Sequence, residues 1–154
     1  VLSWRLQLVS TGDLDEDSRR LVCGLWHPRE SDGLFRALLE RTGEGQEPEP
    51  LTVLLGLTLL KRPDWTLQGL SLLSHVDLDK AVPEAQRVDV LLEVAYGHYF
   101  AGDLKGAGEY LEQCGRLKTS RLQEEAIADL AQRRRWHTSG VSLHPSNPVV
   151  ENQE

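Results

Sequence analysis

The residue types best suited to hold a metal ion are the thiol of Cys23 and the imidazole of His27. They stand four positions apart, so on a helix they would share one face. A structural zinc site usually has four ligands of this kind, and Cys114 and His98 complete the set only if the fold brings them together. We therefore interpret Cys23 as an ordinary buried cysteine and His27 as a helix-end residue, and we expect no metal and no cofactor.

Two further groupings contain potential acids and bases: His75 with Asp77 and Asp79, and His98 between Tyr96 and Tyr99. Acid–base and nucleophilic catalysis need a base that a third group orients in a pocket. Neither grouping comes with a nucleophile motif, and the glycines near position 106 lack the Lys-Ser/Thr pair of a phosphate loop. We expect no catalytic site, and interpret these side chains as core or surface residues of a protein that is not an enzyme.

A short basic run consists of Arg133, Arg134 and Arg135, followed by Trp136 and His137. Such a run can meet an acidic partner or a nucleic acid, but positive charge is also stabilised at the C-terminal end of a helix by the helix dipole. The net charge of −7 and the pI of about 5.2 argue against nonspecific binding to nucleic acid or to anionic membranes. We interpret the run as a solvated helix end and expect no nucleic-acid partner.

The composition suits one domain with a hydrophobic core, since 40% of the 154 residues are apolar. Two cysteines are too few for a disulfide framework and suit the cytoplasm or another reducing compartment. The longest apolar stretch, residues 51–60, is too short to cross a bilayer, so we expect no membrane insertion. The sequence contains no methionine, even at position 1, and we expect it to be a trimmed chain or a domain of a longer protein.

Two amphipathic helices joined by a tight turn are predicted across residues 88–118. The first should be buried on two sides because it has two apolar stripes. One stripe contains Val88, Leu91, Leu92, Ala95 and Tyr99, and the other contains Val90, Val94 and Phe100. Gly102 can adopt the left-handed conformation that ends this helix. Asp103 can then cap the second helix.

This stretch resembles the tetratricopeptide repeat, a helix–turn–helix unit of about 34 residues with small and aromatic residues at fixed positions. The residues that carry the resemblance are Ala95 in the first helix, Gly102, Asp103 and Leu104 in the turn, and Ala107, Leu111 and Cys114 in the second helix. His98 departs from the pattern, because the family usually has Tyr there. The resemblance implies an array of antiparallel helical hairpins.

A second, less regular hairpin is predicted over residues 51–76. Gly56 aligns with Ala95, and a shift of one residue places Gly69 at the matching small position of the second helix. The loop of residues 77–84 would absorb the extra length of this unit. We interpret the segment as an irregular second repeat.

Two more helices are predicted in the N-terminal part of the chain. The first starts near Asp13 and runs to about Trp26, where His27 and Pro28 stop it. Its buried residues are expected to be Leu14, Leu21, Val22 and Leu25. The second spans about residues 31–43.

A last helix is predicted after a cap at Thr119 or Ser120. Its apolar residues are Leu122, Ala126, Ile127, Leu130 and Ala131. Residues 44–50, rich in Glu, Pro and Gly, should form an exposed linker. Residues 138–154 lack periodicity, so we expect a helical domain of residues 1–137 followed by an extended or disordered tail.

The resemblance also implies a binding surface, because the first helix of each tetratricopeptide hairpin lines a concave groove. The residues that would line it are Leu92, Tyr96, Tyr99 and Phe100 from one hairpin, and Leu57, Leu60 and Lys61 from the other. Family members that grip a C-terminal carboxylate have Lys and Asn where this chain has Leu92 and Tyr96. An apolar, aromatic groove suits a hydrophobic segment or helix instead. The alternative is that the aromatic residues belong to the core and pack against the last helix.

The sequence therefore predicts an all-α fold of six or seven helices in antiparallel hairpins, a short tetratricopeptide-like solenoid or bundle with a C-terminal capping helix. The expected function is a non-catalytic protein–protein interaction or scaffold module that binds a hydrophobic peptide or helix of another protein, with self-association left open. One alternative is a chaperone-like or regulatory domain that shields one client. The other is a small all-α enzyme or ligand-binding domain.

Overall fold

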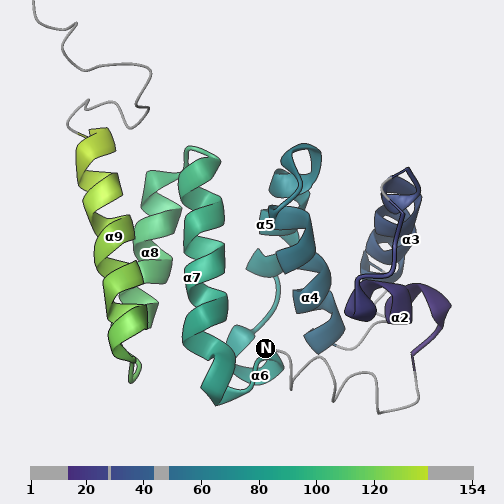
Figure 1. Ribbon diagram of the computed structural model, residues 1–154, viewed down its shortest axis with the longest axis horizontal. Helices are drawn as coiled ribbons and strands as arrows, with labels where there is room; N and C mark the ends of the chain where they lie inside the picture. Colours follow the sequence, from purple (N-terminus) through teal and green to yellow (C-terminus); the bar gives the residue numbers. More distant parts are fainter. Residues whose placement is uncertain (1–13, 28, 44–48, 139–154) are drawn as a thin grey trace, which may run out of the picture. The chain divides into compact units, whose positions relative to one another are not determined.

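The computed structural model describes residues 14–27, 29–43 and 49–138, and these residues form helices and short connections without any strand (Figure 1). The all-α prediction is therefore confirmed for the described residues. The helices are α2 (Glu16–Cys23), α3 (Ser31–Gly43), α4 (Glu49–Leu60), the short 3₁₀ helix η1 (Pro63–Trp65), α5 (Thr66–Ser74), α6 (Leu78–Ala81), α7 (Glu84–Phe100), α8 (Leu104–Gly115) and α9 (Arg121–Thr138). The predicted linker up to position 48 and the tail from position 139 lie outside the described residues.

The chain divides into two compact units, Val1–Val90 and Leu91–Glu154, and the boundary lies inside α7. We call them unit 1 and unit 2. Within the described residues, no helix is both long enough and apolar enough to cross a membrane.

Helix α2 begins and ends where local hydrogen bonds dictate. The side chain of Asp15 caps it by accepting a hydrogen bond of 2.9 Å from the Ser18 amide. The helix ends at Gly24, whose φ of 69° is left-handed, and the amides of Gly24 and Leu25 bond back to carbonyls of the last turn. The predicted stop at His27 and Pro28 was therefore wrong. The prediction that Leu25 is buried was also wrong: it lies beyond the helix and is 68% exposed.

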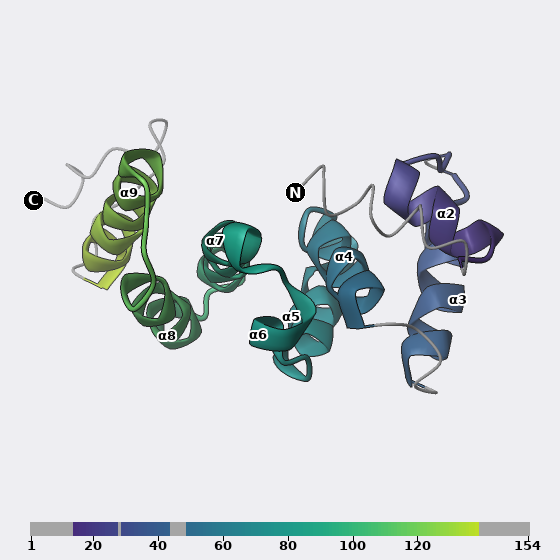
Figure 2. The ribbon, with the colours of Figure 1, turned by 90° about the horizontal axis from the view of Figure 1, so that it is seen from below.

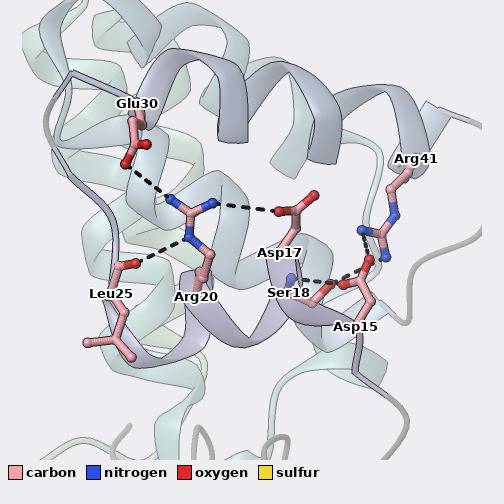
Figure 3. Close-up of polar contacts among 7 residues, drawn as sticks. All are labelled: Asp15, Asp17, Ser18, Arg20, Leu25, Glu30 and Arg41. Atoms are coloured by element: carbon pink, nitrogen blue, oxygen red, sulfur yellow. Dashed lines mark hydrogen bonds and ion pairs between the residues drawn. The ribbon is translucent and has the colours of Figure 1, made fainter.

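Two arginines connect α2 with its surroundings (Figure 3). Arg41, from the end of α3, forms an ion pair with Asp15 and a hydrogen bond with Ser18. Arg20 lies between the carboxylates of Asp17 and Glu30, at 3.8 Å from each. Burial acts to raise the pKa of Asp15, but the hydrogen bonds from Ser18 and the charge of Arg41 outweigh it, so the pKa is lowered.

Aromatic side chains packed around Phe35 of α3 join neighbouring segments of unit 1. The fully buried ring of Phe35 makes edge contacts with Trp26 at 6.2 Å and with Trp65 at 5.7 Å between ring centroids. The guanidinium of Arg62 lies 5.5 Å from the same ring, and the indole N–H of Trp65 donates to Asp32 at 2.9 Å. These contacts connect α3 to the η1 segment.

Helix α4 is the centre of unit 1, since it is apolar on all sides and nearly every residue from Leu51 to Leu59 is buried. It packs along α5 (Figures 1 and 2). At the contact, a Cβ built on Gly69 would lie 2.8 Å from the Gly56 carbonyl oxygen. The two small residues noted in the sequence therefore let the two backbones approach closely.

The connection from α5 to α7 was predicted as a loop but contains the short helix α6. Its cap is Asp77, whose side chain accepts from the Asp79 amide. Leu78 and Ala81 of α6 are buried. At the start of α7, Arg87 donates to the carbonyl oxygens of Asp79 and Val82, at 2.8 and 3.1 Å.

In unit 2, the turn between α7 and α8 has the predicted chemistry. Gly102 has a φ of 88°, and the side chain of Asp103 caps α8 by accepting from the Gly106 amide at 2.9 Å. The amides of Gly102 and Asp103 bond back to the carbonyls of Tyr99 and His98, which closes the end of α7. The chain reverses here, so α8 returns beside α7 (Figure 1).

Helix α9 starts at a reciprocal cap in which Ser120 and Gln123 bond to each other's amides. Of the five apolar residues predicted for this helix, Leu130 is buried and Leu122 is 77% exposed. Near its other end, the Arg134 side chain crosses to α8 and donates to the Leu104 carbonyl at 2.9 Å. It passes over Gly108, where a Cβ would lie 2.6 Å from the guanidinium.

We predict that Gly69→Ala destabilises the protein by about 1–3 kcal/mol, because the new methyl group would meet the Gly56 carbonyl and the Leu59 side chain at the α4–α5 contact. Gly33→Ala is the matched control. It lies inside α3 with nothing within 4 Å of its Cβ position, so it should stabilise by about 0.5–1 kcal/mol. Chemical denaturation of both variants measures this, and equal effects would contradict the close approach.

Candidate functional site

The three aromatic residues in the last two turns of α7 lie together, and we call Tyr96, Tyr99 and Phe100 the aromatic cluster. The rings of Tyr96 and Phe100 stack with centroids 6.2 Å apart, and the ring of Tyr99 meets Phe100 edge-on at 5.2 Å. The ring of Tyr99 also meets His137 of α9 edge-on at 5.9 Å. The cluster therefore joins the C-terminal ends of α7 and α9.

Tyr96 is anchored to α9 by its hydroxyl, which donates to Asp129 at 2.8 Å. Asp129 also accepts from Arg133 at 3.0 Å. Desolvation, together with the hydrogen bond and charge of Asp129, raises the pKa of Tyr96 to about 12, while the charge of Arg133 acts in the opposite direction. The phenol is thus held in its neutral, donating form.

Neighbouring members of the cluster differ sharply in exposure. Tyr99 is 6% exposed, and its hydroxyl is buried without a hydrogen-bond partner among the described residues. Phe100 is 70% exposed. Tyr99 is therefore the buried member of the cluster, whereas the ring of Phe100 is exposed to solvent.

The other residues expected in the groove have different environments. Leu92 and Leu57 are buried, Leu60 is half-buried and Lys61 is exposed. Leu57, Leu60 and Lys61 belong to unit 1, and Leu92 belongs to unit 2 with the aromatic cluster. Only Lys61 and Phe100 of the predicted set are exposed.

His98 forms a polar contact that the sequence did not indicate. Its Nδ1 lies 2.9 Å from Asp103 Oδ2, and its ring stacks on Tyr110 of α8 at 5.2 Å. The pKa of Asp103 is lowered. The hydrogen bond from the Gly106 amide is the largest cause, burial acts against it, and His98 and Lys105 add to the lowering. His98 therefore links the last turn of α7 to α8.

The basic run at the end of α9 is tied to neighbouring groups. Arg133 pairs with Asp129, Arg134 bonds the Leu104 carbonyl and Arg135 bonds Gln132. The interpretation of a purely solvated helix end is thus corrected for Arg134, because its side chain is part of the α8–α9 contact.

The other candidate acids, bases and metal ligands do not come together in one site. His75 bonds the Ser71 carbonyl at 2.8 Å, while Asp79 pairs with Arg87. Cys23 is exposed, which contradicts its interpretation as a buried cysteine: it is the last residue of α2 and points away from the core. Among the residues that the structure describes, no three His, Cys, Asp or Glu side chains are grouped to hold a metal ion.

Comparison of the chain with models of protein families, with curated protein sequences and with solved structures gives no match.

We predict that the two cysteines react very differently with a thiol reagent in the folded protein. Cys23 is exposed, whereas Cys114 is fully buried and burial raises the pKa of its thiol to about 11. In the folded protein, Cys114 should therefore react at least about 100-fold more slowly than Cys23. After unfolding, the two thiols should react at similar rates. Colorimetric thiol titration measures this, with Cys23→Ser to assign the fast phase; two fast thiols would contradict the packing of α8.

We predict that Tyr96→Phe lowers the free energy of unfolding by about 0.5–1.5 kcal/mol at neutral pH, through loss of the hydrogen bond to Asp129. The raised pKa of Tyr96 means that its stabilisation is complete below pH 10.0 and is lost as the pH rises through about 12. Between these pH values, the free energy of unfolding obtained from denaturation curves should fall more steeply for the wild type than for Tyr96→Phe. An equal pH dependence of the free energy of unfolding in the two proteins would show that the Tyr96 hydroxyl is not bonded to Asp129.

Proposed function

We propose that the chain is a non-catalytic interaction module that binds a hydrophobic segment or helix of a partner protein at the exposed end of α7. The observation that carries the proposal is the ring of Phe100, which is 70% exposed and rests against Tyr96 and Tyr99. An aromatic ring in this setting is the kind of residue that anchors protein interfaces.

The two tyrosines packed against Phe100 favour a binding role for this ring over incidental exposure. Tyr96 is fixed by its hydrogen bond to Asp129, and Tyr99 is packed between Phe100 and His137. A ring whose neighbours are already ordered loses less side-chain entropy when a partner covers it. In addition, Tyr96 is half-buried, so part of its apolar ring extends the surface next to Phe100.

The resemblance to the tetratricopeptide repeat points to the same helix. In that family, the first helix of a hairpin carries the residues that touch a bound segment, and α7 is the first helix of the segment that resembles the repeat. Leu92 and Tyr99 are buried and would position this surface, whereas Tyr96 and Phe100 would touch the partner.

We predict that Phe100→Ser weakens binding of a hydrophobic peptide by about 1–3 kcal/mol. The peptide would be selected from a displayed library against the whole chain. Leu122→Ser is the matched control, because Leu122 is an equally exposed apolar residue of unit 2. Both substitutions should leave the free energy of unfolding within about 0.5 kcal/mol of the wild type, since both side chains are exposed.

The binding assay distinguishes three outcomes. Loss of affinity in Phe100→Ser alone supports the proposed surface. Equal loss in both variants indicates general stickiness and contradicts it. If the library yields no peptide and the chain instead forms dimers that Phe100→Ser dissolves, the surface serves self-association and the proposed partner class is wrong.

A further inference from the structure

We propose that the partner segment bound at the aromatic cluster carries an aspartate or glutamate beside its hydrophobic anchor, and that Arg133 of α9 binds this carboxylate. The inference rests on the proposed function, because it names the chemistry of the segment that would cover Phe100. It is carried by the way in which Asp129 holds the Arg133 side chain and by the charges at this end of unit 2.

Arg133 borders the aromatic cluster through a shared carboxylate. Asp129 Oδ2 accepts from the Tyr96 hydroxyl at 2.8 Å and from Arg133 Nε at 3.0 Å. The charge of Arg133 also acts to lower the pKa of Tyr96, so the guanidinium lies near that hydroxyl. The ring of Tyr96 in turn stacks on Phe100. A segment that covers these two rings therefore comes within reach of Arg133.

The guanidinium of Arg133 is held at one edge and open at the other. Only its Nε has a partner among the described residues, namely Asp129, and the side chain is 39% exposed. A guanidinium has five N–H donors in a rigid fork, and its two terminal nitrogens can bind both oxygens of one carboxylate. Because Asp129 already restricts the side chain, less rotamer entropy is lost when a second carboxylate binds.

The surroundings of Arg133 favour a negative partner. Residues 96–100 of α7 and residues 130–138 of α9 contain no Asp or Glu, whereas Arg133, Arg134 and Arg135 lie in the second range. The nearest acid before Tyr96 on α7 is Glu93, which already has a partner. The C-terminal end of a helix carries a partial negative charge of about half an elementary charge, which is less than the charge of the three arginines.

The acidic character of the whole chain does not oppose this contact at short range. The net charge of −7 is spread over 154 residues. Charges on exposed groups are largely screened beyond about 10 Å at moderate salt, so the groups next to the bound carboxylate decide its preference. These groups are the guanidinium of Arg133 and the hydroxyl of Tyr96.

The exposed apolar surface continues on α9 beside this cation. Asp129, Arg133 and Trp136 are spaced by four and three residues, so they share one face of the helix. Trp136 is 43% exposed. A partner helix with an acidic residue three or four positions from an apolar anchor would place both groups on one face, where they can meet Phe100 and Arg133 together.

A displayed peptide library selected against the whole chain tests the inference. Peptides that lose affinity for Phe100→Ser use the aromatic cluster, and these should carry Asp or Glu three or four positions from the apolar anchor. For one such peptide, replacing the acidic residue by its amide should weaken binding about three- to tenfold. Arg133→Gln should weaken binding of the acidic peptide by the same factor and leave the affinity of the neutral peptide unchanged, because one pairing is lost in each case.

Arg135→Gln is the matched control. It removes the same charge from the same helix, but Arg135 points about 200° away from Arg133 around α9 and bonds Gln132. It should keep the preference for the acidic peptide. Equal loss of this preference in both arginine variants would reveal a general attraction and overturn the assignment to Arg133. If Arg133→Gln weakens the acidic and the neutral peptide equally, Arg133 has only a structural role, which also overturns the inference.

The outcomes separate this inference from the proposed function. Peptides that depend on Phe100 but lack an acidic residue, or bind equally well as the amide, overturn the carboxylate contact and leave the proposed function standing. If no selected peptide depends on Phe100, the proposed function fails and the carboxylate contact fails with it.

Discussion

Close packing at positions without a side chain determines how the helices of each unit meet. In unit 1, Gly69 of α5 lies against the backbone of α4 at Gly56. In unit 2, Gly106 leaves room for the His98–Asp103 pair, and Gly108 leaves room for Arg134 to reach α8. Each glycine inside a helix costs about 1 kcal/mol relative to Ala. The contacts made possible by the missing methyl groups offset that cost, so the helices depend on their packing.

Local features of the fold were predictable from the sequence, because they depend on residues a few positions apart. Asp103 and Ser120 cap their helices as expected, and Gly102 takes the left-handed conformation that ends α7. The same rule applies at Gly24, whose left-handed conformation ends α2 four residues before the predicted stop at Pro28. The helix α6 is not predictable from periodicity, because its four residues are too few to show a helical period.

Contacts between distant residues could not be predicted, and the candidate site depends on them. Tyr96 and Asp129, Arg134 and Leu104, and Trp65 and Asp32 are each about thirty residues apart, and no local pattern links them. The aromatic cluster was found from its density in the sequence. Periodicity alone could not decide between groove and core, and the structure divides the cluster: Tyr99 is packed and Phe100 is exposed. The core alternative therefore holds for Tyr99 and not for Phe100, and a binding role for the cluster stays a prediction.

The opposite exposure of Tyr99 and Phe100 follows from helical geometry, and it bears on how a surface can be both apolar and stable. Consecutive helical residues point about 100° apart, so one faces α9 while the next faces solvent. The buried member contributes packing with His137, and the half-buried Tyr96 is fixed by Asp129. The contacts with Tyr96 and Tyr99 restrict the ring of Phe100, so covering this ring would cost less side-chain entropy than covering an unsupported one. The turn that ends α7 follows directly, and there the amides of Gly102 and Asp103 bond back to the carbonyls of Tyr99 and His98. The ring of Phe100 is therefore restrained by Tyr96 and Tyr99 at a helix end that backbone hydrogen bonds close.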